Sequence, residues 1–367
     1  GLCVMENVLI NFGPKIIRMN KYYIAGIMML LLNSCISYDR YENVSQFSFE
    51  DFPVQKELVG NVLEFDSLIM RPRDIFVLDS VLVVVETGMD ELFHVYNLNS
   101  KKYITSHVVR GNGPDDMLSP RFIKGKNDVI SICDMNTSKV YEYGVTDFVS
   151  AIKPEPSYTT KLDSSPFVGV IEIDNKYISN MYGENGKQYN VFDKNGKKIN
   201  QIIDYPSSNI SYTDAEKRDA YYANIVGNGK DRIAVCYSMT DLIEIYSVDG
   251  DLLHRIHGPE QFFARFNEFQ NGEVKTSTPE KNINRDAYFS PCSNNGKFFV
   301  LYDGDFVDSP DNDRSCSFLI MFSWNGKPEA LFRLDVPLIS FTIDKVRNKI
   351  YGISIVPEYH IVEYVLP

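Results

Sequence analysis

The chain has 367 residues, with 37 Lys and Arg against 49 Asp and Glu, which gives a formal net charge of −12. An acidic chain is poorly suited to nucleic acid, because contact with phosphates requires a basic surface. Aromatic residues make up 13% of the sequence, and together with many Val and Ile residues they favour strands. The composition predicts a β-rich protein with no nucleic acid among its partners.

The first dense apolar run follows Met19. Lys21 supplies a basic residue, and residues 24–32 are apolar or small, which is the pattern of a secretory signal. The run is short for a transmembrane helix, which needs about 20 apolar residues. We therefore expect a signal peptide over residues 19–34, and we expect residues 1–18 to be an overextended start without a structural role.

The signal ends in Leu32, Asn33, Ser34 and Cys35, a sequence that resembles the lipobox of bacterial lipoproteins. In that family the chain is cut before the cysteine, and the thiol and the new amino group are acylated. Asn33 departs from the small or aliphatic residue that is commoner there. The resemblance implies a lipid anchor at Cys35, since several acyl chains hold a protein durably to a membrane at about 0.8 kcal/mol per buried methylene. An ordinary signal peptide ahead of a cysteine is the alternative.

The sequence after the signal predicts a tether and one domain. Residues 35–50 are polar and are expected to form the tether, and residues 51–367 are expected to form a single domain. Without residues 1–34 the chain carries 34 Lys and Arg against 48 Asp and Glu, a formal charge of −14. The expected location is the bacterial cell envelope, at the outer membrane, with the periplasmic or surface face left open.

A hairpin pattern recurs along the expected domain as an apolar strand, a polar turn and a second apolar strand. Six such hairpins are predicted over residues 74–86, 122–134, 167–181, 223–237, 290–304 and 339–354. The first five are each followed by a second strand pair, at residues 93–109, 139–152, 189–203, 243–256 and 318–334. Turn dipeptides such as Asn195-Gly196 suit tight connections between these strands.

The sixth unit leaves one strand over, residues 361–366, and residues 54–65 form a strand pattern without a partner ahead of the first hairpin. If the two pair, six units close into a ring that has no unpaired end. Hairpin spacings of 45–67 residues suit propeller blades with loop insertions. The predicted fold is therefore all-β, a six-bladed β-propeller of four-stranded antiparallel blades whose ring is closed by an N-terminal strand. A pair of β-sandwiches is the rival fold.

An internal repeat favours the propeller. Residues 218–237 and 285–302 both begin with Arg-Asp-Ala-Tyr and align with a two-residue gap. With the lipobox, the six strand units and the Gly-x-Gly-Pro turn within residues 110–120, the sequence resembles the TolB-like six-bladed propeller lipoproteins of Gram-negative bacteria. The turn is also similar to one in NHL-type propellers. The resemblance covers roughly residues 50–367, and it implies the fold and export but no activity.

Long loops mark the face of the ring on which a binding site is expected. Loops from strand 2 to strand 3, and from strand 4 to the next blade, gather on one face, where they can vary without disturbing the sheets. Here these loops are residues 110–121, 204–222, 257–289 and 303–315. The binding candidates at this face are Arg110, Arg121, Arg218, Tyr221, Arg285, Tyr288 and His360.

The arginine forks suit carboxylate, sulfate or sugar hydroxyls, and the tyrosine rings offer faces for stacking. The alternative for each arginine is a structural pair with an aspartate of its own loop, namely Asp115, Asp219 or Asp286. A lone histidine such as His360 is also more often structural than functional.

Metal binding is considered at an acidic loop. This loop carries Asp303, Asp305, Asp308, Asp311 and Asp313. Carboxylate oxygens are calcium ligands, and Asp303 and Asp305 are the metal candidates, but the spacing departs from an EF-hand loop. A solvated acidic loop is the alternative, and no cofactor is predicted, with calcium left open.

The other metal-ligating and sulfur-bearing residues are predicted to be structural. His254 and His257 lie three apart on a predicted strand, so they face opposite sides and cannot share one metal ion. Cys133 and Cys236 lie within predicted strands and are expected in the core. A third pair, residues 292 and 316, flanks one hairpin; whether Cys292 and Cys316 form a disulfide is left open by their spacing.

No H-E-x-x-H, G-x-S-x-G or P-loop motif is present, and no nucleophile–base pair can be named. The leading hypothesis is a non-enzymatic, lipid-anchored binding module that presents its looped face to a glycan, a peptide or an envelope protein. The alternative is a metal-dependent hydrolase or lyase of the lactonase or NHL-lyase kind, with its site in the central channel. A purely structural partner in an envelope complex is the third hypothesis.

Overall fold

A computed structural model describes residues 8–12, 15–19, 39–124, 129–150, 153–164, 168–180, 186–272, 274–310 and 313–367. These residues form two compact units, of which the larger consists of Tyr41–Ser207 and Ser211–Pro367. Within the smaller unit, Val8–Phe12 (β1) and Lys15–Met19 (β2) pair as an antiparallel hairpin, which the sequence analysis did not expect. None of the helices in the described ranges has the length and apolar character needed to cross a membrane. The predicted lipidation site, Cys35, lies outside the described residues.

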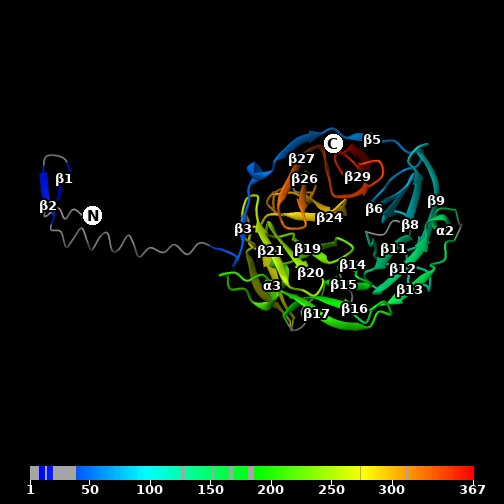
Figure 1. Cartoon of the computed structure of the whole chain (residues 1–367), viewed down its shortest axis with the longest axis horizontal. Helices are drawn as coiled ribbons and strands as arrows, with labels where there is room; N and C mark the ends of the chain where they lie inside the picture. Colours follow the sequence, from blue (N-terminus) through cyan, green and yellow to red (C-terminus); the bar gives the residue numbers. More distant parts are fainter. Residues whose placement is uncertain are drawn as a thin grey trace. The chain divides into compact units, whose positions relative to one another are not determined.

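The larger unit contains six sheets arranged around a common centre, each with four antiparallel strands of which the first is innermost (Figure 1). Blade 1 consists of β6 (Pro72–Leu78), β7 (Val81–Glu86), β8 (Glu91–Asn97) and β9 (Lys102–Val109). Blade 2 consists of β10 (Pro120–Phe122), β11 (Val129–Asp134), β12 (Lys139–Gly144) and β13 (Tyr158–Lys161). Blade 3 consists of β14 (Val170–Ile173), β15 (Lys176–Asn180), β16 (Lys187–Phe192) and β17 (Lys198–Asp204).

The second half of the ring repeats this plan. Blade 4 consists of β18 (Ala223–Gly227), β19 (Arg232–Tyr237), β20 (Leu242–Ser247) and β21 (Leu252–His257). Blade 5 consists of β24 (Tyr288–Asn294), β25 (Lys297–Tyr302), β26 (Cys316–Ser323) and β27 (Pro328–Leu338). Blade 6 consists of β28 (Ser340–Asp344), β29 (Lys349–Ser354), β30 (His360–Val365) and the N-terminal strand β5 (Asn61–Leu63). The predicted six-bladed β-propeller is therefore confirmed.

One predicted strand in blade 2 is wrong. The second half of the expected pair at residues 139–152 is the short helix α2 (Val145–Ser150), and the fourth strand is β13. Phe148 of this helix is buried and contacts Phe93 and His107 of blade 1. An apolar pattern of this length cannot distinguish a strand from one helical turn, and packing against the neighbouring blade decides in favour of the helix.

Ring closure uses an N-terminal strap, which we define as residues 41–63. Its last strand, β5, pairs antiparallel with β30, so the predicted joining of the two ends of the domain is confirmed. The earlier part of the predicted strand has a different partner, because β4 (Val54–Leu58) runs parallel to β27 at the outer edge of blade 5. Before it, β3 (Ser45–Gln46) runs parallel to β21 at the edge of blade 4. The strap therefore crosses the outer edges of three consecutive blades (Figure 1).

The propeller unit begins at Tyr41, which is earlier than the expected boundary at residue 51. Tyr41 and Phe47 are both buried in the core of the ring. Between β3 and β4, the 3₁₀ turn η1 (Phe49–Asp51) places Phe49 against the same core. The polar composition of residues 35–50 hid these few buried aromatic side chains.

Two insertions extend the face on which strand 4 of one blade leads to the next. The first is α3 (Asp214–Ala220), whose N-terminus is closed by a capping box between Thr213 and Glu216. The second is the hairpin formed by β22 (Phe266–Asn271) and β23 (Val274–Pro279), which follows blade 4 and contacts α3. We call this the loop face, and both insertions fall within the loops predicted to be long.

A recurring hydrogen-bond pattern ties the loop face to the inner sheets. In blades 1, 2 and 3 the last residue of the second strand accepts bonds from two successive backbone N–H groups of the segment that leads to the first strand. The three residues are Glu86, Asp134 and Asn180, and the acceptor distances lie between 2.8 and 3.2 Å. These bonds satisfy backbone groups that would otherwise be unpaired at the mouth of the channel.

The four cysteines of the propeller are buried and free. Cys133 and Cys236 lie in core strands, as the sequence predicted. Cys292 and Cys316 lie in one apolar cluster between blades 5 and 6, and they do not form the disulfide that the spacing left open.

Candidate functional site

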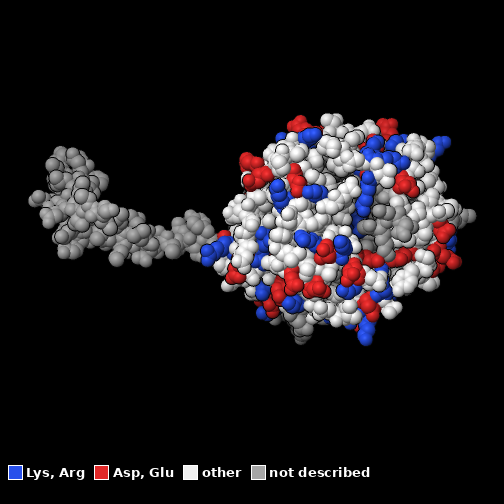
Figure 2. All heavy atoms as spheres, in the orientation of Figure 1, with Lys and Arg blue, Asp and Glu red and all other residues white. Residues whose placement is uncertain are grey.

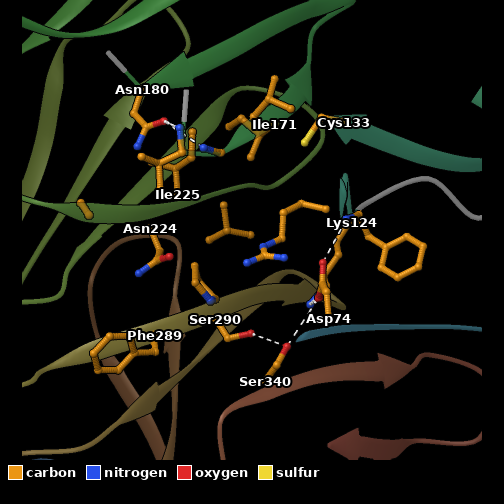
Figure 3. A pocket seen from close by; sticks show the side chains of 18 of the residues that line it. Asp74, Lys124, Cys133, Ile171, Asn180, Asn224, Ile225, Phe289, Ser290 and Ser340 are labelled. Atoms are coloured by element: carbon orange, nitrogen blue, oxygen red, sulfur yellow. Dashed lines mark hydrogen bonds and ion pairs between the residues drawn. The ribbon is translucent and has the colours of Figure 1, made fainter. Parts of the chain in front are cut away.

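The centre of the ring holds a cavity of about 250 Å³, which we call the upper cavity. Its lining comes from the beginnings of the innermost strands of all six blades, namely β6, β10, β14, β18, β24 and β28, and from the residues next to them (Figure 3). Because these strands begin on the loop face, the upper cavity lies on that side of the ring. Backbone and side chains far apart in sequence therefore meet at one site.

Lys124 and Asp74 form the channel floor. The ammonium of Lys124, just after β10, lies 3.2 Å from Oδ1 of Asp74 on β6 and donates to the carbonyl of Phe341 on β28 at 2.8 Å. The two side chains are only 17% and 8% exposed. Lys124 also lines a second, lower cavity of about 150 Å³ at the other ends of the strands. The floor therefore lies between the upper and the lower cavity.

Asp74 joins three blades. Its carboxylate accepts bonds from the backbone N–H groups of Ile75 and Phe122, both at 2.9 Å, and from the hydroxyl of Ser340 at 3.5 Å. Ser340 in turn lies 3.3 Å from the hydroxyl of Ser290 on β24 (Figure 3). With its bonds to Lys124, this carboxylate is fully engaged within the protein and has a structural role.

Two arginines directly follow the proline that begins the inner strand of blades 1 and 2. Arg73 follows Pro72 at the start of β6, and Arg121 follows Pro120 at the start of β10. Both line the upper cavity. Asp74 on β6 accepts a hydrogen bond from the backbone N–H of Phe122 on β10. Arg73 and Arg121 directly precede these two residues, so they lie on neighbouring strands that this bond holds together.

Neither guanidinium has an acidic partner among the described residues. Arg121 is half-buried and donates to the carbonyl of Pro120, its own neighbour, at 3.2 Å. Arg73 is exposed and lies at a β-bulge, where the register between β6 and β7 shifts. Among the described residues, the upper cavity thus combines two cations without an acidic partner and one carboxylate that is already neutralised by Lys124.

The remaining lining is a mixture of amide and apolar side chains. Oδ1 of Asn180 accepts from the backbone N–H groups of Val168 and Gly169, which leaves its NH₂ group as a further donor. The NH₂ group of Asn224 donates to Ser238 and to the carbonyl of Tyr288. A third group is apolar and consists of Ile171, Ile225 and Phe289.

Charge on the face of the ring that Figure 2 shows is mixed. Figure 2 shows acidic and basic side chains interspersed over the ring, with a short run of Lys and Arg atoms beside its centre. The chain as a whole is acidic, with a net charge of −12. The positive charge of Arg73 and Arg121 is therefore a local feature of the cavity.

The structure brings only one of the predicted binding residues into the cavity, and this is Arg121. Arg110 is exposed and donates to the carbonyl of Thr87 at 3.3 Å. Arg218 lies in the last turn of α3 and donates to the carbonyl of Lys275 at 3.4 Å. His360 is half-buried at the start of β30, and its Nδ1 lies 2.7 Å from the carbonyl of Glu358.

The Arg-Asp-Ala-Tyr repeat supplies packing groups. Tyr221 and Tyr288 are 3% and 0% exposed, and both lie in aromatic clusters within the core. Arg285 forms an ion pair with Glu260 at 2.9 Å and lies over the ring of Phe306. These contacts correspond to the structural alternative, although the partner of Arg285 is a glutamate from another part of its long loop.

The aspartates considered as loop partners also have other contacts. Asp115 pairs with Lys153 at 2.6 Å, and Asp286 lies 3.7 Å from Arg314. Asp219 accepts from the hydroxyl of Ser277.

The acidic loop of blade 5 lies apart from the channel lining. Burial raises the pKa of Asp303 to about 7, and the nearby Asp286 adds to this effect. Oδ2 of Asp303 has no hydrogen-bond partner among the described residues, whereas its Oδ1 accepts from the backbone of Asp305. The backbone N–H of Asn282 donates to Asp308, and residue 311 lies outside the described ranges. Among the residues that the structure describes, no three His, Cys, Asp or Glu side chains are grouped closely enough to hold a metal ion.

The sequence matches the model of the TolB-like six-bladed propeller family over residues 48–346. The chain belongs to this family. Among solved structures, this TolB-like protein is similar to a protein of Bacteroides fragilis described as exported, at 14% identity over 87% of this chain and 99% of the other, with a TM-score of 0.48. It is also similar to a member of the DUF4221 family from Bacteroides vulgatus, at 9% identity over 85% of this chain and 96% of the other, with a TM-score of 0.53. At such identities the likeness concerns the fold alone. No curated protein matches the sequence.

Sequence analysis missed Arg73, Asp74 and Lys124, three of the polar residues of the channel of this TolB-like protein. A signal for the first was present, because aligning the first strands of blades 1 and 2 places Pro72-Arg73 opposite Pro120-Arg121. The search concentrated on long loops, whereas these residues belong to the short inner strands.

Proposed function

We propose that the protein is a lipid-anchored binding module of the bacterial cell envelope. Its loop face contacts a glycan, a peptide or an envelope protein, and a projecting group of that ligand enters the upper cavity. The observation that carries the proposal is the presence of Arg73 and Arg121, two guanidinium groups without acidic partners in the described part of the chain, at a cavity on which all six blades converge. Concave sites with a few polar groups amid apolar walls are typical of ligand binding.

The loop insertions also indicate that the loop face is the binding surface. Both α3 and the β22–β23 hairpin extend the connections between blades on the side where the upper cavity opens. Tyr212 fixes them together, because its hydroxyl donates to the carbonyl of Ala264 at 2.7 Å. Such loops can diverge without disturbing the sheets, which makes them suitable for selecting a ligand.

The chemistry of the lining favours binding over metal-dependent hydrolysis. Asp74 is the only carboxylate among the described lining residues of the upper cavity, and its oxygens are taken by Lys124 and backbone N–H groups. A metal-dependent hydrolase or lyase would need several free oxygen or nitrogen ligands directed at one point.

The predicted anchor would keep the ring close to the bilayer. Only five residues, 36–40, separate Cys35 from the start of the propeller unit at Tyr41. A fully extended chain of this length spans at most about 18 Å. A ligand of the module would therefore be an envelope component or a molecule that reaches the membrane surface.

Binding is tested by a thermal-shift screen of the full chain against glycan and peptide libraries, with Ile225→Trp as the matched variant that fills the cavity. Hits that stabilise the wild type and lose their effect in Ile225→Trp support the proposal. It is contradicted if every hit is kept by the filled variant, or if the wild type turns over a substrate.

Anchoring is tested separately by expression in a Gram-negative host. The wild type should partition into detergent and incorporate labelled fatty acid, whereas Cys35→Ser should do neither. Equal behaviour of the two proteins would remove the lipid anchor from the proposal.

A further inference from the structure

We propose that the group which enters the upper cavity is an oxyanion, and that Arg73 and Arg121 bind it. The inference rests on the proposed function, because it names the chemistry of the ligand for the same site. The shared chemistry is a carboxylate, sulfate or phosphate carried on a small polar body.

The charge of the lining is the first argument. Among the described lining residues there are three cations, Arg73, Arg121 and Lys124, and one carboxylate, Asp74. The ion pair of the floor neutralises Lys124 and Asp74 within the protein. Two positive charges therefore remain at one cavity of a chain whose net charge is −12.

The second argument is the type of cation. A guanidinium presents a planar set of donors that matches the two oxygens of a carboxylate or of a sulfate edge. Asn180 adds a neutral donor, since its oxygen is already held by two backbone N–H groups and its NH₂ group is left. Acceptor oxygens on the ligand are the complement of such a donor-rich lining.

The size of the cavity limits the inserted group. About 250 Å³ is slightly below the range of roughly 300–1,000 Å³ that is usual for small-molecule sites. Lys124 and Asp74 form a floor beneath it, so a group can enter from the loop face only as far as this ion pair. The site therefore fits one acidic sugar unit, or a single anionic side group, at the end of a larger ligand.

The experiment uses the full chain and three probes at constant ionic strength, namely sodium glucuronate, glucose and sodium sulfate, with binding measured by calorimetry and thermal shift. Glucuronate is expected to bind and glucose is not, because the two differ in the carboxylate. Binding of sulfate as well as glucuronate would show that the oxyanion alone is recognised. Binding of glucuronate without sulfate would show that the sugar body contributes.

Variants locate the site. Arg73→Gln and Arg121→Gln should each weaken glucuronate binding by about 10- to 100-fold, since a hydrogen bond to a charged group is worth about 1.5–3 kcal/mol. Arg121→Lys should fall between the wild type and Arg121→Gln, because it keeps the charge and loses the fork. The matched control is Arg333→Gln, which removes an exposed arginine of β27 at the outside of blade 5.

The outcomes separate the two proposals. If glucuronate and sulfate both fail to bind, or if glucose binds as well as glucuronate, the oxyanion inference is overturned. It is also overturned if Arg73→Gln and Arg121→Gln behave like Arg333→Gln while their unfolding curves match the wild type. In each case the proposal of a binding module is still supported if Ile225→Trp loses the hits of the library screen. That proposal is contradicted if Ile225→Trp keeps them.

Discussion

The ammonium of Lys124 lies 3.2 Å from the carboxylate of Asp74, and this contact joins blade 2 to the neighbouring blade 1 beside the upper cavity. The same ammonium bonds to the carbonyl of Phe341 in blade 6. One side chain therefore connects three blades at the point where the upper cavity ends. The contribution of this buried contact to stability can be tested by substitution of the two side chains.

We expect Lys124→Met to destabilise the protein by about 3 kcal/mol, because it leaves the largely buried Asp74 carboxylate without its counter-ion. The free energy of unfolding from denaturant titration measures this loss. Asp74→Asn combined with Lys124→Met should recover part of it, since the double variant has no unpaired charge. If the double variant loses as much free energy of unfolding as the two single variants lose together, the interaction between the two side chains does not contribute to stability.

The second prediction concerns the closure of the ring. Val62 of β5 lies opposite Val362 of β30, so Val62→Cys with Val362→Cys should form a disulfide under oxidising conditions. The bridge should stabilise the protein by about 2–4 kcal/mol, because it closes a loop that contains almost the whole ring. Mass spectrometry of the non-reduced protein detects the bond.

The control for this register is Val54→Cys with Val362→Cys, because Val54 pairs with Ala330 in blade 5 instead. If the control cross-links as efficiently as Val62→Cys with Val362→Cys, the strap does not hold the register described above.

A third prediction concerns the buried ion pair of blade 4. Glu244 is fully buried and accepts from Arg255 at 2.5 Å and from the hydroxyls of Tyr237 and Tyr246 at 2.7 and 2.6 Å. We expect Glu244→Ala to cost about 3–5 kcal/mol, because it leaves a buried guanidinium unpaired.

The comparison is with Glu329→Ala, which breaks a partly exposed ion pair with Lys297 and should cost less than about 1 kcal/mol. Arg255 also donates to the carbonyl of Glu42 in the strap. Limited proteolysis should therefore cut near residue 42 faster in Glu244→Ala than in Glu329→Ala. Equal rates would show that the buried pair does not hold the strap.

The fourth prediction is a pH dependence at Asp303, whose pKa is raised by burial to about 7. The folded protein binds this proton more tightly than the unfolded chain does, so the stabilisation is complete at low pH. It is lost as the pH rises from the ordinary carboxyl range, about 4, to about 7. Asp303→Asn should therefore be more stable than the wild type at pH 8, by about 1–2 kcal/mol, and closer to it at pH 4. A difference in stability that does not change between these two pH values would contradict this assignment.

The strand plan of the ring was predictable because each blade repeats an apolar hairpin with its own turn residues. The helix at Val145–Ser150 was not, since Phe148 takes its place through contacts with blade 1 that no local pattern records. Similarly, the tether between Cys35 and residue 51 was expected to be polar throughout, but Tyr41 and Phe47 are buried beneath neighbouring blades. Burial by distant segments decided each of these cases.

The site was less predictable than the fold for a related reason. Tyr221 and Tyr288 lie in segments that the sequence analysis treated as long loops, yet both are buried and fill the core. Arg73 and Arg121 belong to strands that look ordinary in sequence, and only the circular arrangement of the blades directs both to one cavity. Loop length indicates where a ligand approaches, whereas the register of the inner strands determines what it meets.

The path of the strap has a mechanical consequence. A pull on the chain ahead of Tyr41 acts first on the parallel ladders that β3 and β4 form with blades 4 and 5, and only then on the pairing of β5 with β30. Force applied at the N-terminal side of Tyr41 would thus shear two outer ladders before it reached the pairing of β5 with β30. The closed circle, and with it the shape of the central cavity, is shielded from tension at the N-terminus.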